Sequence, residues 1–267
     1  MLVSFMKSNR KKFGASVVVI LVGLMTIIGL SDIIFIIPNQ NNQTDNQAKT
    51  MEESGFLNAS DGKKISYQYF KSPDPKGWVV YLHMMPSTKE SFFDLAVKLQ
   101  TLGYEGISID FRGHGQSEGG PDGYLNFSDS EHQNYYNDVL GTVDFLVSQG
   151  AKKEKIYFVG ASIGANVALK YLSLNKETTK AVLLSPGFNY RGITTKDLVV
   201  NLSETKDILF VSSQDDESNS GEVEELFSLV PQSAKKDKVI FEKAGHGTDM
   251  FAVQSDLYEK IISFITN

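Results

Sequence analysis

The sequence predicts an α/β fold with a mainly parallel sheet and helices on both of its faces. Short runs rich in β-branched and aromatic residues, typical of buried strands, alternate with longer stretches in which apolar residues recur at helical spacing. Such alternation gives parallel strands joined by covering helices. Ligands of these sheets bind at the carboxyl ends of the strands, so we expect functional residues there.

The first two strands are expected to form an antiparallel hairpin, because Asp61-Gly62 separates residues 56–58 from the alternating run 65–70. Apolar runs predict the later strands at 78–82, 106–109, 155–159, 180–184, 207–211 and 238–241. Helical periodicity predicts helices at 89–102, 130–147, 165–172, 222–229 and 256–265.

Composition excludes several classes of function. The chain contains no cysteine, which rules out disulfides, thiolate metal sites and cysteine nucleophiles. Residues 50–267 carry 21 Lys/Arg against 30 Asp/Glu, and an acidic domain without a basic stripe argues against nucleic acid as a partner. The sequence shows no metal-binding cluster and no nucleotide motif, so we expect no metal and no cofactor.

The N-terminal segment predicts a membrane anchor. Four basic residues within 1–12 precede an apolar run at 13–37, and about 20 apolar residues suffice to span a bilayer. The basic cluster is expected to stay in the cytoplasm, which places the rest of the chain outside the cell membrane. A cleaved signal peptide followed by secretion is the alternative, although no clear cleavage site follows the run.

The remaining chain divides into two parts. Residues 38–54 are rich in Asn, Gln, Thr and Glu without an apolar pattern, which predicts a polar tether. Residues 55–267 are expected to form one catalytic domain.

The pattern G-x-S-x-G at Gly160–Gly164 lies where a predicted strand turns into a predicted helix. In that context it indicates a nucleophile elbow, which holds the Ser162 hydroxyl above the end of the sheet. Small residues around Ser162 let strand and helix approach closely. The N–H of Ile163, at the start of the helix, is expected to point to where an oxyanion develops. A turn without chemistry is the alternative.

From Ser60 onward, over about 200 residues, the chain resembles an α/β-hydrolase. The resemblance is closest to serine hydrolases that include esterases, monoacylglycerol lipases and serine aminopeptidase-like proteins. It depends on the elbow and on Asp110–Gly119, which resembles the family's D-x-R-G-x-G-x-S segment. It implies an α/β-hydrolase fold, here with a minimal cap because only residues 186–206 separate two strands.

The order of the family also implies an acid and a base. His246 lies between two glycines after the last strand and is the expected base. The family pattern places the acid four residues beyond the strand that ends at Val211, which selects Asp215. Asp216 is the alternative acid, and a solvated acidic loop is a third interpretation. Asp215 would hold the His246 imidazole in the required tautomer.

The strand at 78–82 leads into His83-Met84-Met85, where relatives have His-Gly-x. The resemblance implies a second oxyanion donor there, and by position we expect the N–H of Met85. Met84 takes the glycine position and would narrow that side of the substrate site. His83 is expected to fix the loop.

Two further expectations complete the site. Asp110 and Arg112 are expected to satisfy buried backbone groups and charge, and His114 is not expected to be catalytic. In the cap, Phe188 and Tyr190 are expected to line the acyl pocket or to pack beneath a short helix.

The sequence thus predicts a membrane-anchored serine hydrolase that cleaves carboxylic esters through an acyl-enzyme on Ser162. The expected substrates are small esters, acylglycerols or short peptides. A serine peptidase is one alternative, and an inactive membrane-tethered binding protein is another.

Overall fold

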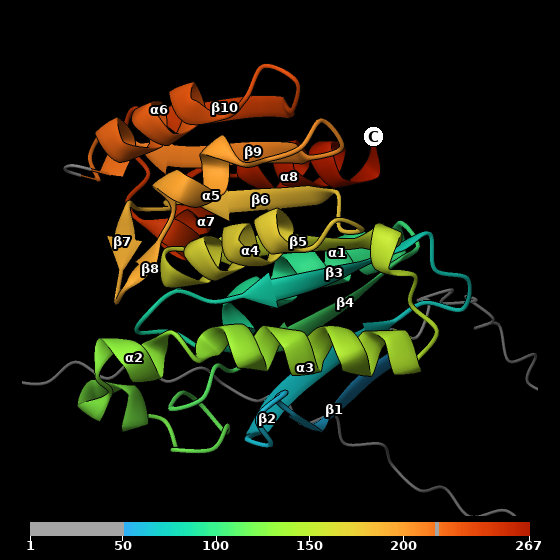
Figure 1. The fold of residues 1–267 in the computed structure, drawn as a ribbon. Coiled ribbons are helices and arrows are strands. Elements are labelled where there is room, and N and C mark those ends of the chain that lie inside the picture. The colour runs from blue at the N-terminus through green and yellow to red at the C-terminus, as the bar shows by residue number, and fades with distance from the viewer. Residues whose placement is uncertain (1–50, 217–218) are drawn as a thin grey trace, which may run out of the picture. The chain divides into compact units, whose positions relative to one another are not determined.

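The computed structural model describes residues 51–216 and 219–267 (Figure 1). The predicted basic segment at 1–12 and membrane segment at 13–37 lie outside these residues. Among the helices of the described residues, none is long and apolar enough to cross a membrane.

The central sheet has eight strands in the order β1-β2-β4-β3-β5-β6-β9-β10. The two pairings at one edge, β1 with β2 and β2 with β4, are antiparallel, and the other pairings are parallel. The sheet strands are β1 (Met51–Asn58), β2 (Lys64–Lys71), β3 (Gly77–Leu82), β4 (Tyr104–Ile109), β5 (Ile156–Ala161), β6 (Lys180–Leu184), β9 (Asp207–Ser213) and β10 (Lys235–Phe241). The mainly parallel sheet predicted from the sequence is confirmed.

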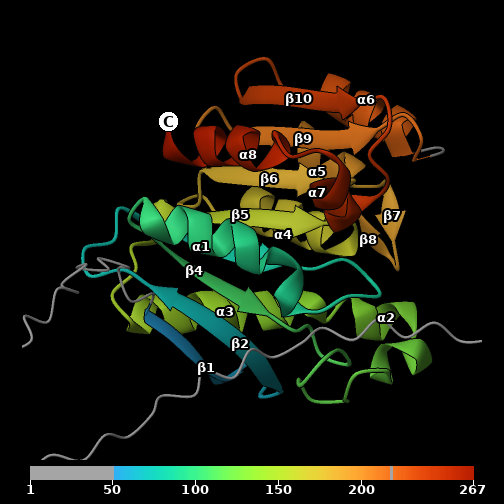
Figure 2. The same cartoon turned by 180° about the vertical axis from the view of Figure 1, so that it is seen from behind.

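Helices cover both faces of the sheet. One face carries α3 (Tyr135–Ser148), α4 (Ile163–Leu174) and α6 (Asn219–Leu229), which lie in front of the strands in Figure 1. The opposite face carries α1 (Phe93–Thr101) and α8 (Leu257–Thr266), seen in Figure 2. The shorter elements are α2 (Asp129–His132), α5 (Lys196–Val200), α7 (Met250–Val253) and four 3₁₀ turns, η1 (Lys89–Phe92), η2 (Gly123–Asn126), η3 (Lys153–Lys155) and η4 (Gly247–Asp249).

Several boundaries differ from the sequence-based expectation for physical reasons. β1 begins at Met51, within the stretch expected to be a tether, because an edge strand pairs through its backbone with Lys64–Lys71 and needs no apolar pattern. β10 begins at Lys235 and is the other edge of the sheet. Its charged residues hide the strand pattern, as is common in edge strands. The helix expected at 130–147 is broken into α2 and α3.

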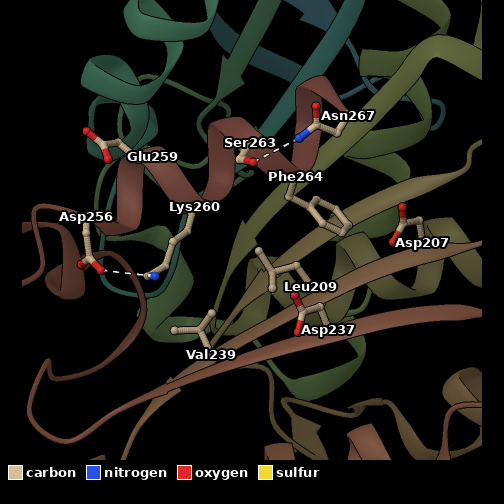
Figure 3. A pocket seen from close by; sticks show the side chains of 10 residues that line it. All are labelled: Asp207, Leu209, Asp237, Val239, Asp256, Glu259, Lys260, Ser263, Phe264 and Asn267. Atoms are coloured by element: carbon tan, nitrogen blue, oxygen red, sulfur yellow. Dashed lines mark hydrogen bonds and ion pairs between the residues drawn. The ribbon is translucent and has the colours of Figure 1, made fainter.

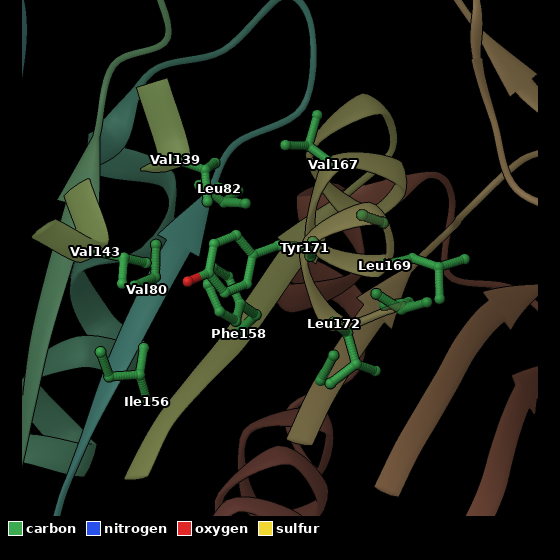
Figure 4. Close-up of a cluster of buried hydrophobic side chains, with 14 of the residues drawn as sticks. Val80, Leu82, Val139, Val143, Ile156, Phe158, Val167, Leu169, Tyr171 and Leu172 are labelled. Atoms are coloured by element: carbon green, nitrogen blue, oxygen red, sulfur yellow. The ribbon is translucent and has the colours of Figure 1, made fainter. Parts of the chain in front are cut away.

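The core that supports the functional edge lies between α3, α4 and the middle strands (Figure 4). Tyr171 of α4 packs on Phe158 of β5 with ring centroids 4.8 Å apart. Leu82, at the end of β3, is fully buried in the same cluster. This packing joins α4 to the two strands β3 and β5, whose carboxyl ends border the site.

The insertion between β6 and β9 is short, as expected. It consists of a two-stranded hairpin, β7 (Asn189–Tyr190) and β8 (Ile193–Thr194), followed by α5. The hairpin lies beyond the carboxyl ends of the central strands, at the left in Figure 1, on the same side as α2. It therefore stands at the edge where the functional residues were expected.

Candidate active site

Ser162 sits in the sharp turn between β5 and α4 with a φ of 52° and a ψ of −120°. A left-handed φ costs a non-glycine residue about 1–2 kcal/mol. The turn is forced by close packing: a Cβ on Gly160 would lie 2.4 Å from the Gly164 carbonyl oxygen, and one on Gly164 would lie 2.3 Å from the Leu82 carbonyl oxygen. The geometry is that of the expected nucleophile elbow.

The turn is also held by backbone hydrogen bonds. The Ser162 N–H donates to the Leu184 carbonyl at 2.8 Å, and its carbonyl accepts from the N–H groups of Ala165 and Asn166. These bonds leave the hydroxyl as the part of Ser162 that reaches the open edge of the sheet.

Two backbone N–H groups border the same depression as Ser162. A depression of about 390 Å³ is lined by Met85, Ser162, Ile163, Asn189, Tyr190 and Arg191. Among the described residues no hydrogen-bond partner is found for the N–H of Ile163 or of Met85. Both residues were expected to be oxyanion donors, and both amides are free to bind an oxygen.

His246 follows β10 in a loop and pairs with a carboxylate. Its Nδ1 lies 2.7 Å from Asp216 Oδ2. Because an ionised carboxylate can only accept, Nδ1 donates in this bond, and in a neutral ring that arrangement leaves a lone pair on Nε2, as a general base requires. The His246 side chain is 34% exposed and that of Asp216 is 16% exposed.

The residue in contact with His246 is thus the alternative acid, Asp216, and the expectation that Asp215 orients the imidazole is corrected. Asp215 Oδ1 accepts hydrogen bonds from Ser213 Oγ and from the N–H groups of Ala244 and Gly245. These bonds, that of Ser213 foremost, lower the pKa of Asp215 to about 2. Asp215 therefore fixes the backbone of the histidine loop, and Asp216 contacts the ring.

The two adjacent acids follow the end of β9 and face different partners. β9 continues to Ser213, two residues beyond the apolar run that ends at Val211. Asp215, two residues beyond the end of this strand, bonds the backbone of the histidine loop, and Asp216, one residue further, bonds the ring of His246. The serine pair at 212–213 is the sequence feature that accompanies this arrangement. The Ser212 hydroxyl bonds Asn219, and the Ser213 hydroxyl bonds Asp215.

Among the described residues no hydrogen bond joins the side chains of Ser162 and His246, but the loop of His246 passes close to the end of β5. A Cβ on Gly247 would lie 3.5 Å from Ala161 Cβ, so the histidine loop runs past the residue that precedes Ser162. The Tyr190 ring stands edge-on to the His246 ring, with centroids 6.3 Å apart. Catalytic hydrogen bonds are often long in unliganded enzymes and tighten when substrate binds.

Tyr190 is held at this junction by polar contacts. Its hydroxyl donates to the Ser185 carbonyl at 3.3 Å and accepts from Asn219 Nδ2 at 3.2 Å. Burial, followed by the charges of Asp216 and Glu222, raises the pKa of Tyr190 to about 12, while contacts with Asn219 and Ser162 act in the opposite direction. The tyrosine is therefore a neutral phenol beside the serine.

The other two residues expected to bind substrate lie elsewhere. Met84 packs beside Gly247, where an added Cβ would come within 2.8 Å of its sulfur. Phe188 packs against the core, with Lys196 Nζ 3.8 Å from its ring centroid. Of the three side chains named from the sequence, only Tyr190 lines the depression at Ser162.

Sequence reasoning also missed two residues that hold the surroundings of the site: Ser185 supports the histidine loop, and Asn219 supports Tyr190. Ser185, fully buried with a φ of 50°, accepts the Gly247 N–H at 3.0 Å through its hydroxyl. Asn219 bonds Ser212, Pro186 and Tyr190 with one side chain. Both act only through contacts across the fold, which no local pattern in the sequence reveals.

The side chains of His83 and His114 and of the Asp110–Gly119 segment bond or pack against neighbouring parts of the fold, which agrees with the structural roles expected for them. His83 Nε2 accepts the Phe111 N–H at 3.0 Å and joins the ends of β3 and β4. Asp110 pairs with Lys89 at 2.7 Å, and Arg112 bridges Asp61 and Asp138. His114 is buried and stacks on Tyr124 with ring centroids 4.2 Å apart.

A larger depression, of about 510 Å³, lies apart from these residues between β9, β10 and α8 (Figure 3). Its side chains include an ion pair between Lys260 and Asp256, and it contains none of the residues around Ser162. Among residues 51–216 and 219–267 no cluster of potential metal ligands is found.

Residues 73–214, just over half of the chain, match the family model described as serine aminopeptidase, S33, or Hydrolase_4. The chain belongs to this hydrolase family. No curated protein matches it significantly. This family agrees with the resemblance to α/β-hydrolases that the motifs of the sequence indicate.

Solved structures confirm the fold of this S33-family chain. An esterase of Pyrococcus furiosus superposes with a TM-score of 0.66 at 20% identity, covering 84% of this chain and 94% of that one. An esterase of Exiguobacterium antarcticum gives 0.60 at 20% identity, covering 80% and 100%. A dienelactone hydrolase of Anabaena variabilis gives 0.66 at 14% identity, covering 81% and 97%.

The buried histidines beside the site predict a loss of stability in acid. Burial lowers the pKa of His83 to about 4 and that of His114 to about 3. Both values lie below the ordinary value near 6.5, so acid favours the unfolded chain, which binds the protons first. For His83 alone the full effect is about 3 kcal/mol, lost between about pH 6.5 and pH 4.

We expect the melting temperature to fall from pH 7 to pH 4.5, and to fall less in His114→Phe, which keeps a ring on Tyr124 but cannot be protonated. Thermal denaturation followed by circular dichroism measures both profiles. Parallel profiles for the wild type and His114→Phe would contradict this account of His114.

Proposed function

We propose that this hydrolase cleaves carboxylic esters through an acyl-enzyme on Ser162. The observation that carries the proposal is the 2.7 Å hydrogen bond between Asp216 and His246, in a loop that runs past the strained turn at Ser162. The three side chains supply the nucleophile, base and orienting carboxylate of acyl transfer, in the chain order of the α/β-hydrolases.

In the proposed reaction Ser162 Oγ attacks the ester carbonyl while His246 Nε2 takes its proton. Asp216 stabilises the imidazolium that forms. The N–H groups of Ile163 and Met85, which line the depression with Ser162, stabilise the oxyanion. His246 then protonates the leaving alcohol, and a water molecule activated by the same imidazole releases the acid. Apart from the ester and water, each step uses only groups of the chain, so the reaction needs no cofactor.

The depression favours an ester over a peptide with a free N-terminus. The peptidase alternative is suggested by the family description, serine aminopeptidase. An aminopeptidase must bind the ammonium group of its substrate, which calls for a carboxylate nearby. The residues that line the depression include no carboxylate, and their single charged side chain is the cation Arg191. The names of two superposed structures, both esterases, agree with this choice.

We further propose that the enzyme is anchored in the cell membrane by residues 13–37, with its catalytic domain outside. The support is the apolar run and the four basic residues that precede it. Secretion after cleavage remains the alternative outcome.

Because Asp216 and Asp215 have different proposed roles, substituting each of them is expected to have a different effect. Asp216→Asn is expected to lower kcat about 10⁴-fold, because an amide favours the wrong imidazole tautomer. Asp215→Asn is expected to lower activity far less and to lower the melting temperature, since it weakens the bonds to the N–H groups of Ala244 and Gly245. Initial rates on 4-nitrophenyl butyrate and thermal melts test both variants. A folded Asp216→Asn with nearly wild-type rate, beside an inactive Asp215→Asn, would contradict the assignment.

The anchor predicts that the full-length chain sediments with membranes and that external protease removes its domain from intact cells. Immunoblotting after fractionation and protease treatment measures both. A shorter, soluble form in the medium would indicate cleavage, and a full-length form in the cytosol would overturn the proposal.

A further inference from the structure

We propose that Arg191 determines specificity, by binding a carboxylate carried by the ester close to its scissile bond. The inference depends on the proposed ester hydrolysis and names a class of substrate for it. It starts from the position of Arg191 at the tip of the β7–β8 hairpin, where it lines the same depression as Ser162, Ile163 and Met85.

The backbone at this tip is unusual for an arginine. Tyr190 pairs with Ile193, so Arg191 and Gly192 form a two-residue hairpin turn, with φ values of 52° and 79°. Turns with two left-handed residues usually place Asn, Asp or Gly at the first position. A long cationic side chain at such a position indicates that its placement has a use, because strained residues gather at functional sites.

The hairpin is held firmly to the helix of the nucleophile. Asn166, one turn after Ser162 on α4, is fully buried and donates from Nδ2 to the carbonyls of Gly187 and Ile193 at 3.0 and 2.9 Å. Its Oδ1 accepts the Gly187 N–H at 3.0 Å. The position of Arg191 relative to Ser162 is therefore preorganised, which lowers the cost of binding a charged group.

The tip also packs against a second element. A Cβ on Gly192 would come within 2.3 Å of Gln133 Nε2, just after α2. Asn189 Oδ1 accepts the Gly192 N–H at 2.8 Å and closes the turn. The hairpin is thus supported at its base by α4 and at its tip by the residues after α2.

The Arg191 guanidinium has no carboxylate partner in the described part of the chain, although its charge acts on the pKa of His132 and of Tyr135. Among the described residues it forms no ion pair or hydrogen bond, although the side chain of Asp129 lies close to Gly192. The other arginine of the described residues, Arg112, bonds two carboxylates. In an acidic domain, a guanidinium without an ion pair, on a residue that lines the same depression as Ser162, is available for an anion, and its planar fork matches a carboxylate.

The test compares charged and neutral esters of matched size. On the acyl side the pair is 4-nitrophenyl hemisuccinate and 4-nitrophenyl butyrate; on the alcohol side it is 4-carboxyphenyl acetate and 4-methylphenyl acetate. For at least one pair, Arg191→Gln is expected to lower the charged-to-neutral ratio of kcat/KM about tenfold or more, since a charge-assisted hydrogen bond is lost. Arg191→Lys is expected to restore part of the ratio, and added salt to lower it in the wild type.

Two further variants control the result. Arg191→Asn removes the charge but suits the turn, so a melting temperature at or above that of the wild type would show that the hairpin remains intact. Lys196→Gln removes a nearby cation that pairs with Glu225 and does not line the depression, and it is expected to keep the ratio. Unchanged ratios for both pairs in Arg191→Gln would overturn the inference and leave ester hydrolysis standing.

The proposed function can fail separately. If the wild type hydrolyses none of the four esters, ester hydrolysis is overturned. Calorimetry with monoethyl succinate then decides the inference: weaker binding by Arg191→Gln than by the wild type supports it, and equal binding or none overturns it.

Discussion

The close approach of β5 and α4 is the constraint on which the site depends. Only glycine at positions 160 and 164 lets the helix start directly against the strand and the end of β3. The turn then has no alternative to a left-handed Ser162, whose strain of about 1–2 kcal/mol is offset by the packing of α4 on the sheet. The same contact aligns the Ile163 N–H with the depression and sets the position of Asn166, which holds the β7–β8 hairpin.

The histidine loop lies opposite the turn at Ser162, and polar contacts hold it in addition to the packing of Ala244 and Met84. Asp215 binds two of its amides, Ser185 binds a third, and Asp216 binds the imidazole itself. These groups come from the ends of β6 and β9, two neighbouring strands of the sheet. The parallel sheet therefore places Ser162, Asp216 and the loop of His246 at the carboxyl ends of its strands, although these residues are distant in the sequence.

The parallel sheet, the sharp turn at Ser162 and the loop that contains His246 could be predicted from the sequence, because each depends on a local pattern: alternation of elements, small residues around Ser162, glycines around His246. The choice between Asp215 and Asp216 cannot be made from a count of residues, because it depends on which of two adjacent side chains faces the loop backbone and which faces the His246 ring. Ser185 and Asn219 were missed because their roles exist only between distant segments. The left-handed Arg191 likewise has no local signature, since its turn usually contains Asn or Gly.

The most direct test of the central claim, that Ser162 is an activated nucleophile, is labelling with a fluorophosphonate, which reacts with serines paired to a catalytic base. The domain would be incubated with the probe, and the modified residue mapped by peptide mass spectrometry, with Ser162→Ala as the matched control. One adduct is expected, on Ser162, and it should be absent from Ser162→Ala and form much more slowly in His246→Ala. A folded wild-type protein that acquires no adduct, or acquires it on another serine, would contradict the account.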